Sequence, residues 1–313
     1  MYNKAPYIER MVKSISEQTY LTRTKIFVVN DCSTDGSFEI LRESADRYQV
    51  PMTVFFNEKN MGMDYTVRRL YRYVDTEYFA VLDPDDYYIS SERWEKAIQF
   101  LNQNPSYYVH FCNYVCVSKD GTVGKAVISH PNRTFNNYSE SISTPIPTSM
   151  AVFRNFFTKK FLDSAEQYAG NARLSFVSED DFRNVCAFHY GKGYFDNFIG
   201  VGFQEGGLWS SGTGVDSGIM ACKIFYDLSL FSKNVLKDNL SFTTCLKMAC
   251  DYYMNAVNSL CNRLRNLTGS DWKNSSHCAD LFGVGNQKLS WAVDILLQQQ
   301  NDLKSAGLQV AYA

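Results

Sequence analysis

Three carboxylates stand directly after an apolar stretch at residues 78–82. Asp83, Asp85 and Asp86 follow the run Tyr-Phe-Ala-Val-Leu, and Pro84 separates the first two acids. Such a run predicts a buried strand that ends at the proline, which has no N–H for the ladder, so the acids lie at a strand end. Convergent carboxylates suit Mg²⁺ or Mn²⁺, especially where a substrate phosphate supplies further ligands. A polar turn that faces water explains the same residues equally well, and both interpretations stay open here.

Two more groups of acids accompany predicted elements. Asp31 follows an apolar strand predicted at residues 25–30, and Glu179, Asp180 and Asp181 open a predicted helix. The helix dipole favours a carboxylate at a helix N-terminus, so capping readily explains one member of that cluster. It does not readily explain three, which makes the cluster a second candidate for chemistry.

The elements that must position these acids alternate between helix and strand. Apolar spacing and capping residues predict helices at about 6–15, 37–48, 63–74, 91–102, 156–164 and 178–191, and strands at 25–30, 52–56, 78–82, 107–117 and 150–154. Asp35 or Ser37 is expected to cap the second helix, and Ser91 the fourth. The alternation predicts an α/β fold with a parallel, doubly wound sheet that becomes mixed after residue 107. Ligands bind beyond the carboxyl ends of such strands, where these acids stand.

Composition excludes several classes of protein. The 313 residues are 45% hydrophobic, enough for one large domain or two, and 31 basic against 33 acidic side chains leave a net charge of −2. This balance argues against a nucleic-acid partner and gives no strong attraction to a membrane. Nine scattered cysteines, a polar start and no apolar run of bilayer length indicate a soluble cytoplasmic protein with reduced thiols. Neither a GxGxxG nor a GxxxxGK[ST] fingerprint occurs, which weakens a nicotinamide or P-loop function.

The second half of the chain changes in character. Gly and Ser dominate residues 206–214 around Trp209, Ser210 and Ser211, the composition of a mobile lid or, alternatively, of a plain connector. Helical patterns follow, one of them near residues 288–304. An apolar stripe at helical spacing predicts core or subunit contact and comprises Cys245, Met248, Ala249, Tyr252, Ala256, Leu260 and Leu264.

Six short motifs in order resemble the family 2 glycosyltransferases, which have the GT-A fold, over about residues 2–214. They are Tyr2-Asn3, the run Ser14 to Tyr20, the run Val29 to Ser37, Asn60 with Gly62, the DXD-type run Leu82 to Asp86, and Glu179-Asp180. The resemblance implies a mixed sheet flanked by helices, with a helical C-terminal extension. It also implies a metal-dependent, inverting glycosyltransferase of the hexosyltransferase type that uses a nucleotide-sugar, usually a UDP-sugar.

The resemblance also implies roles for individual residues. The nucleotide would contact Tyr2, Asn3, Asp31, Asn60, Gly62 and Asp83. Asp83 and Asp85 would hold Mn²⁺ or Mg²⁺ on the diphosphate. Asp180 would be the catalytic base, with Glu179 and Asp181 as alternatives in the same turn.

The resemblance divides the chain into expected regions. We expect a GT-A domain at 1–214, with a nucleotide-binding half at about 1–105 and an acceptor half at about 106–214, and a helical region at 215–313. The acceptor would be a carbohydrate or a lipid-linked glycan in surface polysaccharide or glycoconjugate synthesis. The protein would be cytoplasmic, or peripheral at the inner membrane face, with the C-terminal helices contacting the membrane or a second copy of the chain.

The sequence departs from the family pattern in three places. Asn30 replaces the first acid of a D-D pair, and Val67-Arg68 stand where an Arg-Asn pair is expected. The sequence also starts where the family's first strand should have ended, which suggests a truncated sequence or a misplaced start codon. A non-catalytic nucleotide-sugar-binding or scaffold protein is therefore the alternative function, and a nucleotidylyltransferase is a weaker third.

Overall fold

Two sheets carry the residues of interest. The computed structural model describes residues 1–142, 144, 147–172, 179–205 and 215–266. In the smaller sheet, β1 (Phe27–Asn30) and β2 (Thr53–Phe56) pair in parallel, with Asn30 opposite Phe56. The carboxyl ends of both strands therefore lie side by side, as the sequence predicted.

The larger sheet is mixed. Its strands are β3 (Tyr78–Ala80), β4 (Tyr87–Tyr88), β5 (Tyr107–Val117), β6 (Val123–Ala126), β7 (Arg133–Phe135), β8 (Ala151–Arg154) and β9 (Lys192–Gln204). Their order is β3-β8-β5-β9-β4, with β6 beside β5 and β7 beside β9. β5 and β9 run parallel, whereas the other described pairs of this sheet are antiparallel. The predicted mixed sheet is confirmed, and β1 and β2 are parallel as predicted. The prediction that the strand at 78–82 continues this parallel sheet was wrong, because β3 lies in the larger sheet and pairs antiparallel with β8.

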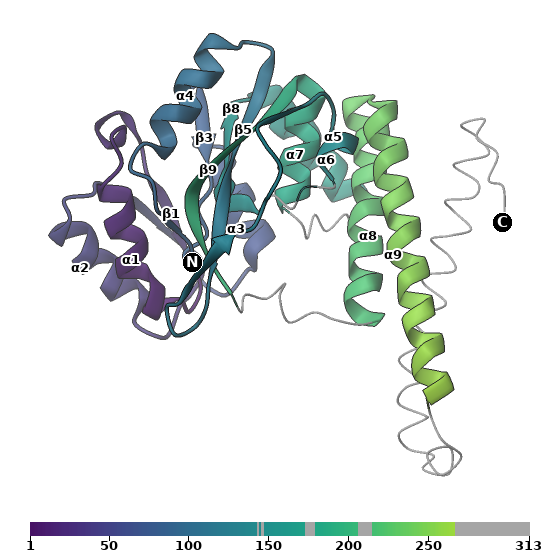
Figure 1. Ribbon diagram of the computed structural model, residues 1–313, viewed down its shortest axis with the longest axis horizontal. Coiled ribbons are helices and arrows are strands. Elements are labelled where there is room, and N and C mark those ends of the chain that lie inside the picture. The colour runs from purple at the N-terminus through teal and green to yellow at the C-terminus, as the bar shows by residue number, and fades with distance from the viewer. Residues whose placement is uncertain (143, 145–146, 173–178, 206–214, 267–313) are drawn as a thin grey trace. The chain divides into compact units, whose positions relative to one another are not determined.

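Helices flank the strands. They are α1 (Ala5–Ser16), α2 (Ser37–Arg47), α3 (Met63–Tyr71), α4 (Arg93–Gln103), α5 (Tyr138–Ser141), α6 (Lys159–Ala172), α7 (Glu179–Tyr190), α8 (Val215–Phe231) and α9 (Asn239–Asn266), with short 3₁₀ or π turns η1 (Leu21–Arg23), η2 (Thr148–Met150) and η3 (Ser232–Leu236). In Figure 1, α1 and α2 lie on one side of the strands and α5, α6 and α7 on the other. The α/β fold class is confirmed.

The first helix follows its sequence pattern closely. Pro6 stands in its first turn, where a missing N–H costs nothing. Ile8, Met11, Val12 and Ile15 are at most 6% exposed. The predicted apolar face of this helix is therefore its buried face.

Helix starts were predicted less well. The N-cap position of α2 is Gly36, which adopts φ +81°, while the Asp35 carboxylate accepts a hydrogen bond from the Ser37 N–H at 3.1 Å. α4 begins at Arg93 with Glu92 at its N-cap, so Ser91 is not the cap. Local side-chain hydrogen bonds compete at such positions, and the pattern alone does not choose between neighbouring polar residues.

The long strand β9 was not predicted. Glycines lower the strand propensity of this segment, yet they permit close packing. A Cβ atom at Gly200 would lie 2.5 Å from the Cys112 sulfur, and one at Gly202 would lie 2.4 Å from the Tyr87 ring. Tertiary contacts therefore explain a strand that local propensity disfavours.

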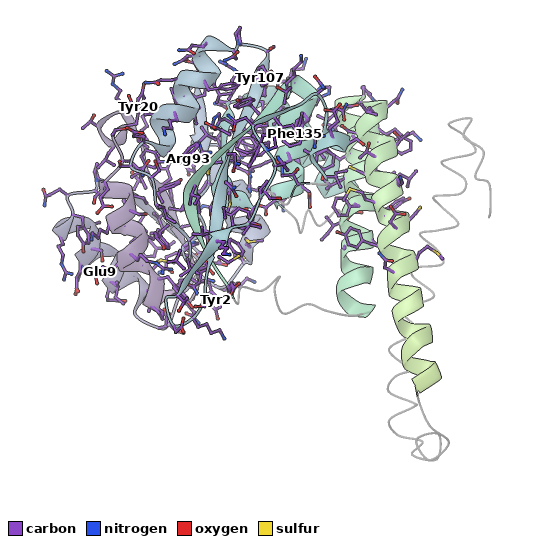
Figure 2. All side chains as sticks on the ribbon, viewed as in Figure 1. Tyr2, Glu9, Tyr20, Arg93, Tyr107 and Phe135 are labelled. Carbon is purple, nitrogen blue, oxygen red and sulfur yellow. The ribbon has the colours of Figure 1, made fainter. Side chains whose placement is uncertain are left out.

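A fully buried guanidinium joins α4 to the sheet. Arg93, labelled in Figure 2, has no exposed surface. Its Nη2 donates to the backbone oxygens of His110, at 3.0 Å, and Met150, at 2.5 Å. Burying a charged group is costly unless it is hydrogen-bonded, so these contacts fix the position of α4 against β5 and η2.

The chain separates into two compact units. One comprises residues 1–207 and 231–241, and the other comprises residues 208–230 and 242–313. The second unit contains most of α8 and α9, where the Phe225 and Tyr252 rings stack with centroids 5.4 Å apart. Cys245 and Ala249 of the predicted stripe are buried there, whereas Tyr252 is 37% exposed. The predicted boundary after residue 214 stays a prediction, and the helix predicted near 288–304 lies outside the described residues.

Candidate active site

The acids after β3 form a tight turn. The Asp86 N–H donates to the Asp83 carbonyl at 3.0 Å, as expected of a turn beginning at Pro84. The Asp86 carboxylate accepts from the Ser149 hydroxyl at 2.6 Å and from the Gln204 N–H at 3.0 Å. Asp86 is only 2% exposed. Asp86 therefore anchors the turn to η2 and β9.

Two carboxyls of this turn have raised pKa values. Burial, followed by the neighbouring charge of Asp85, raises the pKa of Asp83. Burial and the charge of Asp83 raise the pKa of Asp86 to about 8. Burial is the larger cause of both shifts, and a cation bound beside these carboxyls would oppose it by favouring their charged forms.

Two basic residues of the α1 segment contact the same turn. The Lys4 ammonium lies 2.5 Å from an Asp85 carboxylate oxygen. The Arg10 guanidinium donates to the Asp85 carbonyl at 3.1 Å and lies 4.2 Å above the Tyr87 ring. Asp85 is thus held at its side chain by Lys4, the N-cap residue of α1, and at its backbone by Arg10 of that helix.

Asp180 stands in the first turn of α7. The Arg183 guanidinium donates to its Oδ1 at 2.6 Å, and the Thr148 hydroxyl donates to the same oxygen. Burial raises the pKa of Asp180 to about 7 against the opposing charge of Arg183. Its side chain nevertheless keeps 41% of its surface open to solvent. The carboxylate is therefore reachable from solvent, and this exposure weakens the effect of burial on its pKa.

The η2 turn links Asp180 to the turn of Asp83: the Thr148 hydroxyl donates to the Asp180 carboxylate, and the Ser149 hydroxyl accepts from the Asp83 N–H at 3.1 Å. The charge of Asp83 raises the pKa of Asp180, and the charge of Arg183 lowers the pKa of both carboxyls. Of the alternative bases, Asp181 accepts a hydrogen bond from the Tyr138 hydroxyl at 2.7 Å. The side chain of Glu179 lies outside those described.

Asp31 is 2% exposed at the end of β1 and holds the loop that follows β2. Its Oδ1 accepts from the Asn57 amide at 2.7 Å and from the Met61 N–H at 2.8 Å, and its Oδ2 accepts from the Gly62 N–H at 2.9 Å. Gly62 has φ +83° and ψ 164°, a conformation that is essentially restricted to glycine. Asp31 therefore shapes the loop that contains Asn60 and Gly62.

Three further residues were predicted to contact the nucleotide: Tyr2, Asn3 and Asn60. The Asn3 side-chain oxygen accepts from the Thr34 N–H at 2.9 Å, and the Asn60 side-chain oxygen accepts from the Gly62 N–H at 2.9 Å. Tyr2 is 43% exposed and lies at the opposite end of the sheet from Tyr107 (Figure 2). The predicted lid residues Trp209, Ser210 and Ser211 lie outside the described residues.

The turn fits a metal only in part. Among the residues that the structure describes, no group of three or more His, Cys, Asp or Glu side chains could hold an ion by itself. Asp83 and Asp85 would supply two hard oxygen ligands, although the Lys4 ammonium already pairs with Asp85. This donor set suits Mg²⁺ or Mn²⁺ when ligand phosphate oxygens complete the shell.

The comparison with known families agrees with this geometry. The model of "Glycosyl transferase family 2" matches residues 1–163, which is more than half of the chain. The chain belongs to glycosyl transferase family 2. The match includes Asp31, Asp83 and Asp85 but ends before Asp180.

Two relatives of this family 2 chain are named as glycosyltransferases. It is 31% identical over 115 residues to the processive diacylglycerol β-glycosyltransferase of Mycoplasma pneumoniae, covering 36% of this chain and 33% of the relative. It is 29% identical over 121 residues to Bacillus subtilis TuaG, whose name assigns it to teichuronic acid biosynthesis as a glycosyltransferase, covering 39% and 46%. The chain thus matches less than half the length of these relatives.

A solved structure has the same fold as this family 2 chain. Residues 1–349 of S. aureus TarS in complex with UDP-GlcNAc superpose with a TM-score of 0.55 at 18% identity, covering 80% of this chain and 69% of that one. The fold is therefore the GT-A fold that the motifs implied.

Sequence reasoning missed several contributors to the site. Arg183 stands three residues after Asp180 on a helix, a spacing that places the two side chains together and could have signalled it. Lys4, Arg10 and Thr148 gave no comparable signal, because their partners are distant in sequence.

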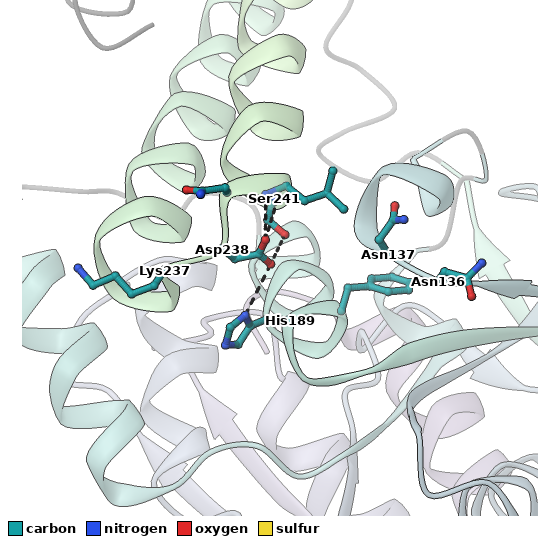
Figure 3. A pocket seen from close by; sticks show the side chains of 9 residues that line it. Asn136, Asn137, His189, Lys237, Asp238 and Ser241 are labelled. Atoms are coloured by element: carbon teal, nitrogen blue, oxygen red, sulfur yellow. Dashed lines mark hydrogen bonds and ion pairs between the residues drawn. The ribbon is translucent and has the colours of Figure 1, made fainter. Parts of the chain in front are cut away.

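A separate open hollow lies away from these acids, within residues 1–207 and 231–241. In Figure 3, His189 and Asp238 point toward each other, with ring nitrogen and carboxylate oxygen 3.6 Å apart. The Asp238 carboxylate also accepts from the Ser241 N–H at 3.1 Å. The hollow has a volume of about 400 Å³ and is lined by Asn136, Asn137, Phe188, His189, Lys237, Asp238, Asn239, Leu240 and Ser241. It contains no residue predicted for the active site.

Proposed function

We propose that this chain transfers a sugar from a UDP-sugar, with inversion, to a hydroxyl of a glycan or lipid-linked glycan. One observation carries the proposal. Asp83, after β3, and Asp180, on α7, are far apart in sequence but are both hydrogen-bonded to the η2 turn, Asp83 through its N–H to the Ser149 hydroxyl at 3.1 Å and Asp180 through its carboxylate to the Thr148 hydroxyl. A donor half and a base in one site are what transfer from a nucleotide-sugar requires.

In the proposed site, the donor binds at the ends of β1 and β2 and at the turn that follows β3. Asp83 and Asp85 would hold Mn²⁺ or Mg²⁺, which supplies positive charge for the leaving diphosphate. Asp31 accepts three described hydrogen bonds, and a carboxylate can accept about four, so it retains capacity for a base N–H. The UDP and UDP-GlcNAc complexes of TarS support a uridine donor.

In the acceptor half of the proposed site, Asp180 is the catalytic base. The acceptor oxygen forms a bond to the anomeric carbon while the bond from that carbon to the diphosphate oxygen breaks. The hydroxyl proton passes to Asp180. Both described hydrogen bonds to its carboxylate end on Oδ1, so Oδ2 is the atom that we assign to the proton. Attack opposite the leaving group inverts the configuration.

The acceptor class rests on the relatives. The names of two of them refer to diacylglycerol and to teichuronic acid, a membrane lipid and a surface polymer. We therefore propose an acceptor in surface polysaccharide or glycoconjugate synthesis. In the described part of the chain, no helix is long and apolar enough to cross a bilayer.

A donor panel tests the proposed function. The chain is incubated with UDP- and GDP-sugars and water as acceptor, with Mn²⁺, Mg²⁺ or a chelator, and the released nucleoside diphosphate is measured. We expect metal-dependent release from a UDP-sugar, at least about a hundredfold slower in Asp85→Asn. Asp120→Asn, in the turn between β5 and β6, is the charge-matched control. Donor binding without release from any sugar would favour the non-catalytic alternative.

A further inference from the structure

Lys4 forms a partly buried ion pair with Asp85 of the turn after β3. Its ammonium lies 2.5 Å from the Asp85 carboxylate, and the two side chains are only 29% and 15% exposed. A surface ion pair is weak because water screens it, whereas a partly buried pair is screened less. Asp85 is also one of the two residues to which we assign the divalent cation. The Lys4 ammonium and the divalent cation would therefore compete for the Asp85 carboxylate.

The backbone holds Lys4 in place. Its N–H donates to the Ser37 hydroxyl at 2.8 Å, and the Ala5 N–H donates to the Asp35 carboxylate at 3.0 Å. On the preceding side, the Asn3 N–H donates to the Ser33 hydroxyl at 3.1 Å. The lysine thus starts from a fixed point, and only its flexible stem can move. A long, flexible side chain on a fixed backbone allows the ammonium group to change partners.

We propose that Lys4 is the internal counter-ion of Asp85, which a divalent cation must displace to bind. The proposal rests on the metal site in the proposed function. The displaced ammonium remains next to the site, where a diphosphate would offer it new negative charge. Without a donor, metal binding would break the Lys4–Asp85 ion pair. With a donor, the lost pair would be replaced by a pair between Lys4 and the diphosphate.

This arrangement has a thermodynamic consequence. If the donor gives Lys4 a new partner, metal and donor bind with positive coupling, and the coupling is reciprocal. Removal of the ammonium should therefore raise metal affinity in the absence of nucleotide and reduce the factor by which UDP increases it.

Mn²⁺ binding to the full chain tests the proposal without an activity readout. Free Mn²⁺ is measured by electron paramagnetic resonance, with and without UDP, for the wild type and for Lys4→Met. We expect the variant to bind Mn²⁺ about tenfold more tightly without UDP, the scale of a charge-assisted contact. Lys4→Arg, which keeps the charge, should retain the wild-type affinity.

Lys13→Met is the matched control, because Lys13 stands in the last turn of α1, the helix that Lys4 precedes, and pairs only loosely with Glu17, at 3.8 Å. It removes the same net charge and should leave Mn²⁺ affinity within about twofold. Equal affinity of folded Lys4→Met and wild type would overturn the counter-ion role while leaving the metal site intact. If none of the proteins binds Mn²⁺, even with UDP, the metal site of the proposed function has failed and the counter-ion role fails with it.

Discussion

At the scale of single residues, the central feature is the pairing of Asp180 with Arg183. Burial raises the pKa of the carboxyl, and the nearby guanidinium partly opposes this. The guanidinium also occupies Oδ1 at 2.6 Å, which orients the carboxylate. A base is most effective when its pKa lies near the working pH. Arg183 therefore acts as a positioning residue that also adjusts the proton affinity of Asp180.

The raised pKa of Asp180 predicts the pH dependence of turnover. Below about pH 7 the carboxyl is protonated and cannot take the acceptor proton, so activity should fall as the pH is lowered. We expect log kcat/KM for UDP-sugar turnover to rise with a slope of about one and to level off above pH 7. Initial rates of nucleotide release from pH 5 to 9 measure this. A rate that stays constant from pH 5 to 8 would contradict the assignment.

At the scale of elements, the carboxyl end of β1 organises the loop after β2. Asp31 accepts hydrogen bonds from three donors of that loop, so the strand end and the loop form one unit at the proposed binding site for the nucleobase. The conformation of Gly62 lets the chain turn into α3 directly after it.

Substitution of Asp31 should loosen this unit. In Asp31→Asn, one carboxylate oxygen becomes an NH₂ group that cannot accept the N–H of a loop residue, so a nearly buried donor loses its partner. We expect a loss of about 1–3 kcal/mol in the free energy of unfolding, measured by urea titration. Asn60→Ala, which removes an exposed hydrogen bond to the same Gly62 N–H, should cost less than about 1 kcal/mol. Equal losses in both variants would argue against the anchoring role of Asp31.

Elements also show how far the sequence could lead. The apolar face of α1, the turn after β3 and the start of α7 at Glu179 follow from local spacing, and the structure contains all three. β9 could not be predicted, because its glycines are explained only by the side chains that pack against them. The sequence likewise pointed to the site acids through short motifs. It did not reveal Lys4 or Thr148, whose partners are distant in the chain.

At the scale of the whole molecule, every described site residue belongs to the unit of residues 1–207 and 231–241. A buried polar group helps to hold this unit together. His110 contacts Arg93 through its Nδ1 at 3.2 Å and lies 3.7 Å from the Asp196 carboxylate. Helix α4 and strands β5 and β9 meet at these three side chains. Contact of the C-terminal helices with a membrane or a second chain stays a prediction.

His110 should make stability depend on acid pH. Burial lowers its pKa to about 4, below the ordinary value of 6.5, so the unfolded chain takes up a proton first as the pH falls. The free energy of unfolding should therefore decrease between about pH 6.5 and 4, with His110 contributing at most about 3 kcal/mol. Urea titrations of the wild type and His110→Gln, compared at each pH, isolate this contribution. Parallel stability curves for the two proteins would exclude it.

The most direct test of the proposed active site compares Asp180→Asn with Asp181→Asn. Each variant is assayed for metal-dependent nucleotide release from the UDP-sugar that the wild type turns over, and UDP binding is measured by calorimetry. We predict that Asp180→Asn lowers turnover at least about a hundredfold and keeps UDP affinity, because the amide cannot take the acceptor proton. Asp181→Asn should lower turnover much less. Unchanged turnover in Asp180→Asn, or a larger loss in Asp181→Asn, would contradict the assignment of Asp180 as the base.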